Sequence, residues 1–215
     1  MNYGQVKRDA LAKIFSDTIA GEQIASTYNN QADYEIPIPG YINDAMTYIA
    51  TTVKRIPAIV KLSDLDMTEE DTYYNYTLPS DCYEVMNGGL ILPFPKNCDR
   101  VVAERYSRYR IYGGTHLWLP KNAPQNLQLE YYRYPVLLSS DPDDDTELDN
   151  TPDTHGPISY YVAAQLVLYD DAFRYAALYN EWETRLGRLK EPVLTESTRV
   201  YDVYGFGHGF EYGWW

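Results

Sequence analysis

Three segments that lie far apart in the chain place apolar side chains on one face of a predicted helix. They are Leu11–Ile19, which Val6 and Ala10 extend backwards and Asn29-Asn30 ends, then Ile42–Val53, and finally Ile158–Leu189. The stripe of the last segment is formed by Val162, Leu166, Tyr169, Phe173, Ala176 and Ala177. A one-sided apolar stripe has to be buried against another element. We therefore expect the three helices to pack as one bundle, with the last helix long and unbroken.

The sequence between the second and third helical segments predicts short β-strands. They are Ala58–Leu62, Tyr73–Leu78, Tyr83–Met86, Val101–Tyr112, His116–Leu119 and Leu127–Tyr131. The residues that separate them are typical of turns: Pro79-Ser80-Asp81, Asn87-Gly88-Gly89 and Gly113-Gly114. Because Leu127, Leu129 and Tyr131 alternate with polar or larger neighbours, they indicate the two-residue period of a half-buried strand. These patterns predict an antiparallel meander inserted between the helices.

The fold class predicted from these patterns is α+β. The helical bundle has two N-terminal helices and one long C-terminal helix, with the antiparallel β domain inserted between them and an extended tail at the end. The predicted divisions are N-terminal helices over 1–56, a β domain over 57–138, an acidic loop over 139–156, the long helix over 157–191 and the tail over 192–215.

The end of the chain combines aromatic side chains with glycine. Its aromatic residues are Tyr201, Tyr204, Phe206, Phe210, Tyr212, Trp214 and Trp215, and four glycines are interspersed among them. Glycine weakens both helix and strand, so this tail has no strong local structure of its own. Since each buried aromatic side chain contributes roughly 1.5–3 kcal/mol, the tail is well suited to docking onto a partner. The alternative is that it folds back onto its own domain.

A loop with six acids between Asp141 and Asp149 follows the predicted β domain. Read as a calcium loop from Asp141, it has Thr146 where the sharp turn needs glycine and Pro152 where a bidentate glutamate is needed. The three histidines of the chain have no metal-ligand spacing. We therefore expect no metal and no cofactor. The acids expected to line a channel or meet another subunit are Asp141, Asp143, Asp144, Asp145 and Glu147.

A basic, tyrosine-rich segment includes Arg105, Arg108 and Arg110. Arginine between aromatic residues can hold phosphates and stack on bases. It can equally pair with the acids of a neighbouring subunit. The net charge of −13 argues against a general nucleic-acid binder, so the sequence favours an inter-subunit role, with the acidic loop as a natural partner.

Composition and motifs argue against a membrane protein, an exported protein and an enzyme. There is no apolar run long enough to cross a membrane, and the polar start of the chain makes export unexpected. Cys82 and Cys98 are expected to be free thiols in a reducing compartment. No nucleophile elbow, phosphate loop or zinc-protease motif is present, so an enzyme is not expected. The 23 tyrosines among 215 residues indicate extensive interfaces, because tyrosine offers large contact area with a polar tip.

The order of these features resembles the head–tail adaptor (connector) proteins of tailed bacteriophages. The segments that carry the resemblance are GYINDAMTYIA (Gly40–Ala50), YTLPSDCYEV (Tyr76–Val85), LEYYRYP (Leu129–Pro135) and HGPISYYVAAQLVLYDDA (His155–Ala172), within a similarity that extends from Val6 to Leu189. The resemblance covers short-tailed and longer-tailed viruses alike.

The resemblance implies a structural virion protein, made in the host cytoplasm and located at the neck of the particle. It implies a ring, usually of twelve copies, that lies below the portal, extends the DNA channel and offers a platform for the next tail or nozzle protein. It also implies docking of a C-terminal segment on the portal and transient contact with DNA. The alternatives left open are another tail-completion or fibre-attachment ring protein and, less favoured, a wall-degrading hydrolase without a motif.

Overall fold

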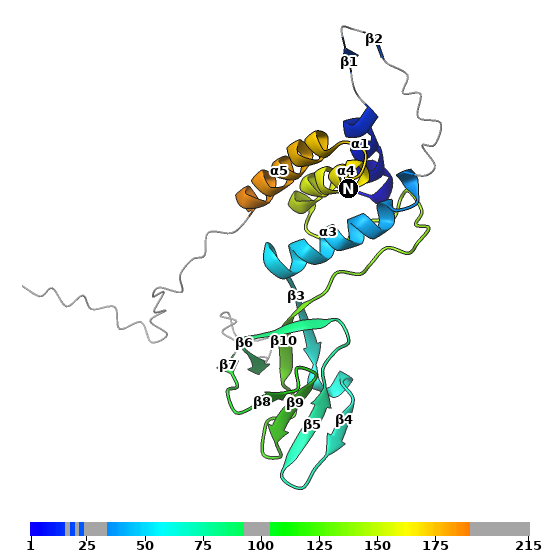
Figure 1. The fold of residues 1–215 in the computed structure, drawn as a ribbon. Helices are drawn as coiled ribbons and strands as arrows, with labels where there is room; N and C mark the ends of the chain where they lie inside the picture. Colours follow the sequence, from blue (N-terminus) through cyan, green and yellow to red (C-terminus); the bar gives the residue numbers. More distant parts are fainter. Residues whose placement is uncertain (16–17, 20–21, 24–33, 93–103, 190–215) are drawn as a thin grey trace, which may run out of the picture.

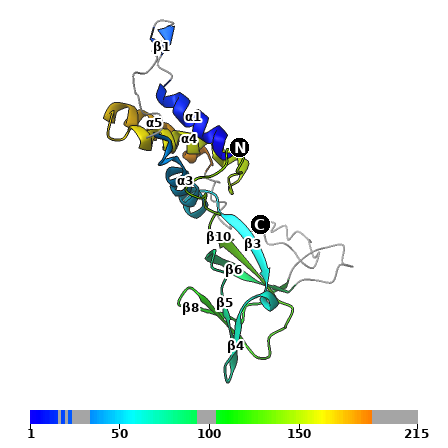
Figure 2. The ribbon, with the colours of Figure 1, turned by 90° about the vertical axis from the view of Figure 1, so that its right-hand side faces the viewer.

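The computed structural model describes residues 1–15, 18–19, 22–23, 34–92 and 104–189 of the 215-residue chain. The fold mixes α-helices with antiparallel sheets and is of the α+β class. Helices gather at one end of a long molecule and the two larger sheets at the other (Figures 1 and 2). Each end has its own cluster of buried apolar residues, so the described chain has two cores rather than one.

Helix α4 (His155–Val167) lies at the centre of the helical core. It packs against α1 (Tyr3–Phe15), α3 (Ile38–Thr52) and α5 (Ala172–Leu189). Its sequence is apolar around most of the helix circumference, which is the pattern of a helix that is buried on all sides. Its buried apolar residues are Pro157, Ile158, Val162, Ala163, Ala164, Leu166 and Val167.

The prediction for the second helix is confirmed by α3. The apolar stripe Ile42, Ala45, Met46, Ile49 and Ala50 is buried. The helix begins at Ile38, before the predicted Ile42, with Pro39 at its second position. Proline is tolerated in the first turn of a helix because the N–H that it lacks would have no intrahelical partner there.

The first helix is shorter than predicted. Helix α1 ends at Phe15, and the chain then forms a two-stranded ribbon of β1 (Thr18–Ile19) and β2 (Glu22–Gln23). The prediction that Thr18 and Ile19 continue the helical stripe is therefore wrong. Both are β-branched residues, whose stiff side chains favour extended backbone.

The prediction of one unbroken helix over 157–191 is also wrong. The chain turns at Leu168–Asp171 and returns as α5, which packs on α4. The reason is a helix cap: the Asp171 carboxylate accepts hydrogen bonds from the N–H groups of Phe173, at 3.1 Å, and Arg174, at 3.0 Å. An aspartate in this position satisfies the free N–H groups of a new helix. Tyr169 and Phe173, assigned to the buried stripe, are instead 93% and 87% exposed.

The β end of the molecule consists of two four-stranded antiparallel sheets. One has the order β3-β10-β6-β7 and the other β4-β5-β9-β8. The strands are β3 (Ile56–Lys61), β4 (Met67–Glu69), β5 (Tyr73–Thr77), β6 (Cys82–Leu92), β7 (Glu104–Arg105), β8 (Arg110–Tyr112), β9 (His116–Pro120) and β10 (Gln128–Arg133). Their shared core contains Leu62, Leu78, Leu90, Leu117, Leu119, Leu127, Leu129 and Tyr131.

The strand order differs from the predicted meander. In a meander each strand pairs with its sequence neighbours, whereas β10 here lies between β3 and β6. The alternation of Leu129 and Tyr131 is confirmed, since both are buried in the core. Strand β10 pairs with β3, and β3 directly follows α3. The chain therefore leaves the β end of the molecule close to the end of α3 (Figure 1).

The Asn87-Gly88-Gly89 segment is not the predicted turn but an irregularity within the single long strand β6. The pairing of β6 with β10 shifts register there, and Gly88 has a φ of 67°. A side chain at Gly89 would place its Cβ in steric conflict with the Glu130 carbonyl oxygen. The glycines therefore serve a bulge and a close approach of two strands. The predicted turn at Gly113-Gly114 is confirmed, with φ of 61° and 73° between β8 and β9.

Candidate interaction surfaces

The predicted docking tail, Tyr201 to Trp215, lies outside the described residues. The two other predicted surfaces, the acidic loop and the basic segment, can be located. They lie in different parts of the molecule, the loop against the helical core and the arginines on the two sheets and the segment that connects them.

The acidic loop lies against the beginning of α1. The Thr146 carbonyl accepts a hydrogen bond from the Tyr3 N–H at 2.8 Å, and the Asp144 carbonyl accepts one from the Gly4 N–H at 2.9 Å. Asn2 and Gln5 complete the cap by exchanging side-chain to backbone hydrogen bonds of 3.0 and 3.1 Å. The first N–H groups of a helix have no intrahelical partner, and here the loop supplies acceptors for two of them.

The loop carboxylates fall into two groups. Asp144 faces its own chain, with Lys7 Nζ at 3.0 Å and Arg8 Nη1 at 3.7 Å, and its hydrogen bond raises the pKa of Lys7. Asp145 accepts a long hydrogen bond from Asn2. Within the described part of the chain, the exposed side chains of Asp141, Asp143 and Glu147 form no ion pair within 4 Å. The loop therefore has unpaired negative charge to offer another molecule.

The three predicted arginines do not lie on one strand, so the predicted strand Val101–Tyr112 is wrong. Arg105 belongs to β7 of the first sheet, and Arg110 to β8 of the second. Tyr106 and Tyr109 lie between Arg105 and Arg110 in the chain. Both are half-buried against the β core, in the segment where the chain crosses from one sheet to the other. All three arginines are exposed, and Arg105 donates a hydrogen bond of 2.8 Å to the Asn87 carbonyl over the bulge.

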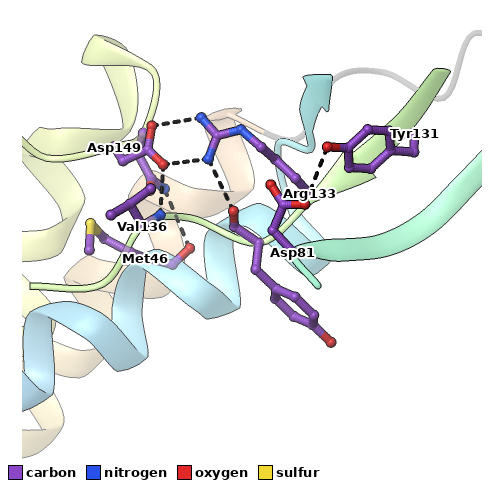
Figure 3. A network of polar contacts seen from close by, with 8 residues as sticks. Met46, Asp81, Tyr131, Arg133, Val136 and Asp149 are labelled. Atoms are coloured by element: carbon purple, nitrogen blue, oxygen red, sulfur yellow. Dashed lines mark hydrogen bonds and ion pairs between the residues drawn. The ribbon is translucent and has the colours of Figure 1, made fainter. Parts of the chain in front are cut away.

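A polar cluster joins the two cores, and sequence analysis did not identify it (Figure 3). Arg133, the last residue of β10, contacts both carboxylate oxygens of Asp149, at 2.5 and 2.8 Å. Asp149 also accepts the N–H of Val136 at 2.7 Å, and the neighbouring Asp81 accepts the Tyr131 hydroxyl at 3.2 Å. Nothing in the sequence spacing marks this pair, because its members are 16 positions apart in the chain.

The electrostatics of this cluster follow from partial burial. The hydrogen bond from Arg133 holds the pKa of Asp149 below its ordinary value, and the pairing raises the pKa of Arg133. Burial and the adjacent Asp81 raise the pKa of Tyr131 to about 12. Cys82, at the start of β6, is a free thiol whose pKa is raised to about 11 by burial. At neutral pH Tyr131 and Cys82 are thus protonated, and the Arg133–Asp149 pair is charged.

The described residues meet neither the requirements of a metal site nor those of a membrane-spanning helix. Among the described residues, no three histidine, cysteine, aspartate or glutamate side chains come together as a metal site would require. His155, the first residue of α4, is buried, its Nε2 is 3.0 Å from the Asn150 carbonyl oxygen, and burial lowers its pKa. None of the described helices combines the length and apolar character needed to span a bilayer.

Comparison with known proteins decides the class. The model of the SU10 adaptor protein family matches residues 1–203, which is nearly the whole chain. The chain belongs to the SU10 adaptor protein family. The resemblance to phage head–tail adaptors is thereby confirmed, and the family is one of structural phage proteins and virion components. None of the curated proteins matches the chain.

The family match includes most, but not all, of the surfaces predicted from the sequence. It covers both cores, the acidic loop and the arginine segment, and it ends at residue 203. Most of the predicted docking aromatics, from Tyr204 to Trp215, therefore lie beyond the matched residues.

Proposed function

We propose that this adaptor assembles as a ring, of about twelve copies, attached below the portal. The ring extends the DNA channel and presents its other face to the next tail or nozzle protein. The family match over residues 1–203 carries the proposal, because adaptor proteins join the portal to the tail. An elongated subunit with separate helical and β cores is suited to contacting two different neighbours (Figure 1).

The ring is tested by its mass. Twelve copies of the 24.9 kDa chain would form a particle of about 300 kDa with cyclic symmetry. Mass photometry of the pure protein, alone and with purified portal rings, should detect one discrete large species. A chain that remains monomeric under both conditions would refute the ring.

We propose that residues Tyr201–Trp215 dock on the portal. Their composition supports this, since aromatic anchors dominate binding energies at protein interfaces. Many identical tails bound to one ring would hold it firmly by avidity even if each contact were weak. Deleting Gly205–Trp215 should leave both cores folded and abolish attachment to the portal. Cross-linking of the tail to another tail component in assembled particles would instead favour a tail-completion or fibre-attachment ring.

The charge of the chain supports a role around DNA. Twelve copies with a net charge of −13 would total about −156, and an acidic channel wall repels DNA so that it passes without adhering. The acidic loop either lines that channel or meets the arginines of a neighbour. Replacing Asp143, Asp144 and Asp145 by asparagine should alter DNA retention or ring assembly. If the triple variant retained DNA and assembled as the wild type does, the loop would have neither role.

A further inference from the structure

One face of the sheet β4-β5-β9-β8 is turned away from the β core and carries an unusual set of side chains. The pairing of the strands places Arg110 opposite Trp118, Tyr112 opposite His116, and Tyr73 opposite Pro120. Side chains on a strand alternate between faces, and Leu117 and Leu119 point into the core. Trp118 and its partners therefore lie on the opposite, outward face.

Three aromatic rings from three strands form a ladder across this face. Tyr112 stacks on Trp118 with ring centroids 4.6 Å apart and an interplanar angle of 17°. Tyr73 contacts the other side of Trp118 at 4.8 Å. The ladder fixes the ring orientations, and Tyr112 at its end remains 55% exposed. The three rings thus form an apolar ridge whose Tyr112 end is accessible to another molecule.

Two arginines lie beside the ridge. Arg108 and Arg110 line, with Tyr73 and Trp118, a shallow depression of about 240 Å³. Both arginines are exposed, and within the described ranges neither forms an ion pair or a side-chain hydrogen bond. The strand pairing puts no aspartate or glutamate at the outward positions of this sheet. Arg108, Arg110, Tyr112, Trp118 and Tyr73 are called the aromatic–arginine face below.

We propose that the aromatic–arginine face binds the segment Asp141-Pro142-Asp143 of a second copy of this chain. The proposal rests on the proposed ring and names the two surfaces that meet in it. Asp141 and Asp143 pair with Arg108 and Arg110, and Pro142 packs on the exposed end of the aromatic ladder. Tyrosine, tryptophan and arginine are the residue types that most often dominate binding energy at protein interfaces.

Charge complementarity argues for this occupant. The face offers two unpaired cations, and the segment offers two exposed, unpaired carboxylates on either side of a proline. Asp144 is already paired with Lys7 and Arg8, and Arg105 is bonded to Asn87, so neither is free to contribute. Arginine and carboxylate can form two parallel hydrogen bonds, which adds specificity to the attraction.

The positions of the two surfaces also suit a ring. The acidic loop lies beside α1, and the aromatic–arginine face lies at the opposite end of the molecule (Figure 1). Two different patches that complement each other form a heterologous contact, and a heterologous contact that closes on itself generates a ring. A self-complementary patch would yield a dimer instead.

The test is a charge exchange, read as the concentration at which rings form, with and without purified portal rings. The double variant R108E/R110E should raise that concentration at least about tenfold, since close interfacial charge pairs are strongly coupled. Adding D141R/D143R in the same chain should restore assembly. The matched control is R105E, which makes the same charge change at an arginine that is bonded within its own sheet, and it should shift assembly much less. Circular dichroism confirms that each variant is folded.

The outcomes separate the two proposals. Assembly lost in R108E/R110E and restored by the loop exchange supports the contact. Assembly that is unchanged in R108E/R110E overturns the contact and leaves the ring standing, and so does a loss that the exchange fails to restore. A wild-type chain that forms no ring in either condition overturns the ring and the contact together.

Discussion

At the scale of single residues, the arginine–aspartate pair between the cores carries the most structural consequence. Arg133 ends β10, an inner strand of one sheet, and Asp149 is the last acid of the acidic loop, close to the start of α4. Their side chains are 23% and 30% exposed, so solvent screens the pair only in part. Removing one partner would leave the other charge partly buried without its hydrogen-bonded counter-ion.

We expect D149N to lower the free energy of unfolding by about 1–2 kcal/mol at pH 7. The pKa of Asp149 lies below its unfolded value, so its contribution is present above the unfolded pKa and is lost as pH falls through the folded one. The difference between D149N and wild type should therefore shrink below about pH 4. Urea unfolding at a series of pH values measures it. The control D143N alters an exposed, unpaired carboxylate and should have no measurable effect.

Gly4 tests the fit between the acidic loop and α1. An alanine Cβ at this position would lie 2.8 Å from the Cβ and Cγ of Asp144 and 3.0 Å from its carbonyl oxygen. We expect G4A to destabilise the protein by about 1–3 kcal/mol, because the loop must move or strain. Thermal unfolding measures the change.

The same substitution at Gly187 is the matched control for G4A. That position lies in α5 with open space around it, so alanine should stabilise the helix by roughly 0.5–1 kcal/mol. Equal effects of the two substitutions would mean that the loop does not constrain α1.

At the scale of elements, sequence patterns predicted those helices and strands whose burial is one-sided. The stripe of α3 and the alternation of β10 were both found, because each has a single buried face. The break between α4 and α5 was missed because Tyr169 and Phe173 continue the apolar period and hide the cap at Asp171. The place of β10 between β3 and β6 could not be predicted, since its partners are distant in the chain and sequence period does not specify them.

The cap of α5 can be removed without touching either core. We expect D171A to cost about 1 kcal/mol, because the N–H groups of Phe173 and Arg174 lose their acceptor. D171N retains a side-chain oxygen in the same place and should be close to wild type. Urea unfolding of the two variants beside the wild type checks this, and a D171A variant as stable as the wild type would show that the cap contributes nothing.

At the scale of the whole molecule, the proposed contact fixes how neighbours overlap. The acidic loop lies with the helical core and the aromatic–arginine face with the far sheet, so their meeting requires subunits that lie oblique to the ring axis. A cryo-electron microscopy map of the ring should show the helical core of one copy beside the sheet β4-β5-β9-β8 of the next. Subunits that stand upright, with sheet beside sheet, would contradict this arrangement.

The joint between the two cores has a mechanical consequence. The chain enters the β end at Ile56 and leaves it at Arg133, and these two residues are paired across β3 and β10. A pull along the molecule therefore loads both strands from the same end, in parallel, and does not peel one from the other. The Arg133–Asp149 pair ties the exit strand back to the loop that follows it. We therefore expect this two-stranded connection to resist stretching along the molecule and to permit the two cores to twist relative to each other.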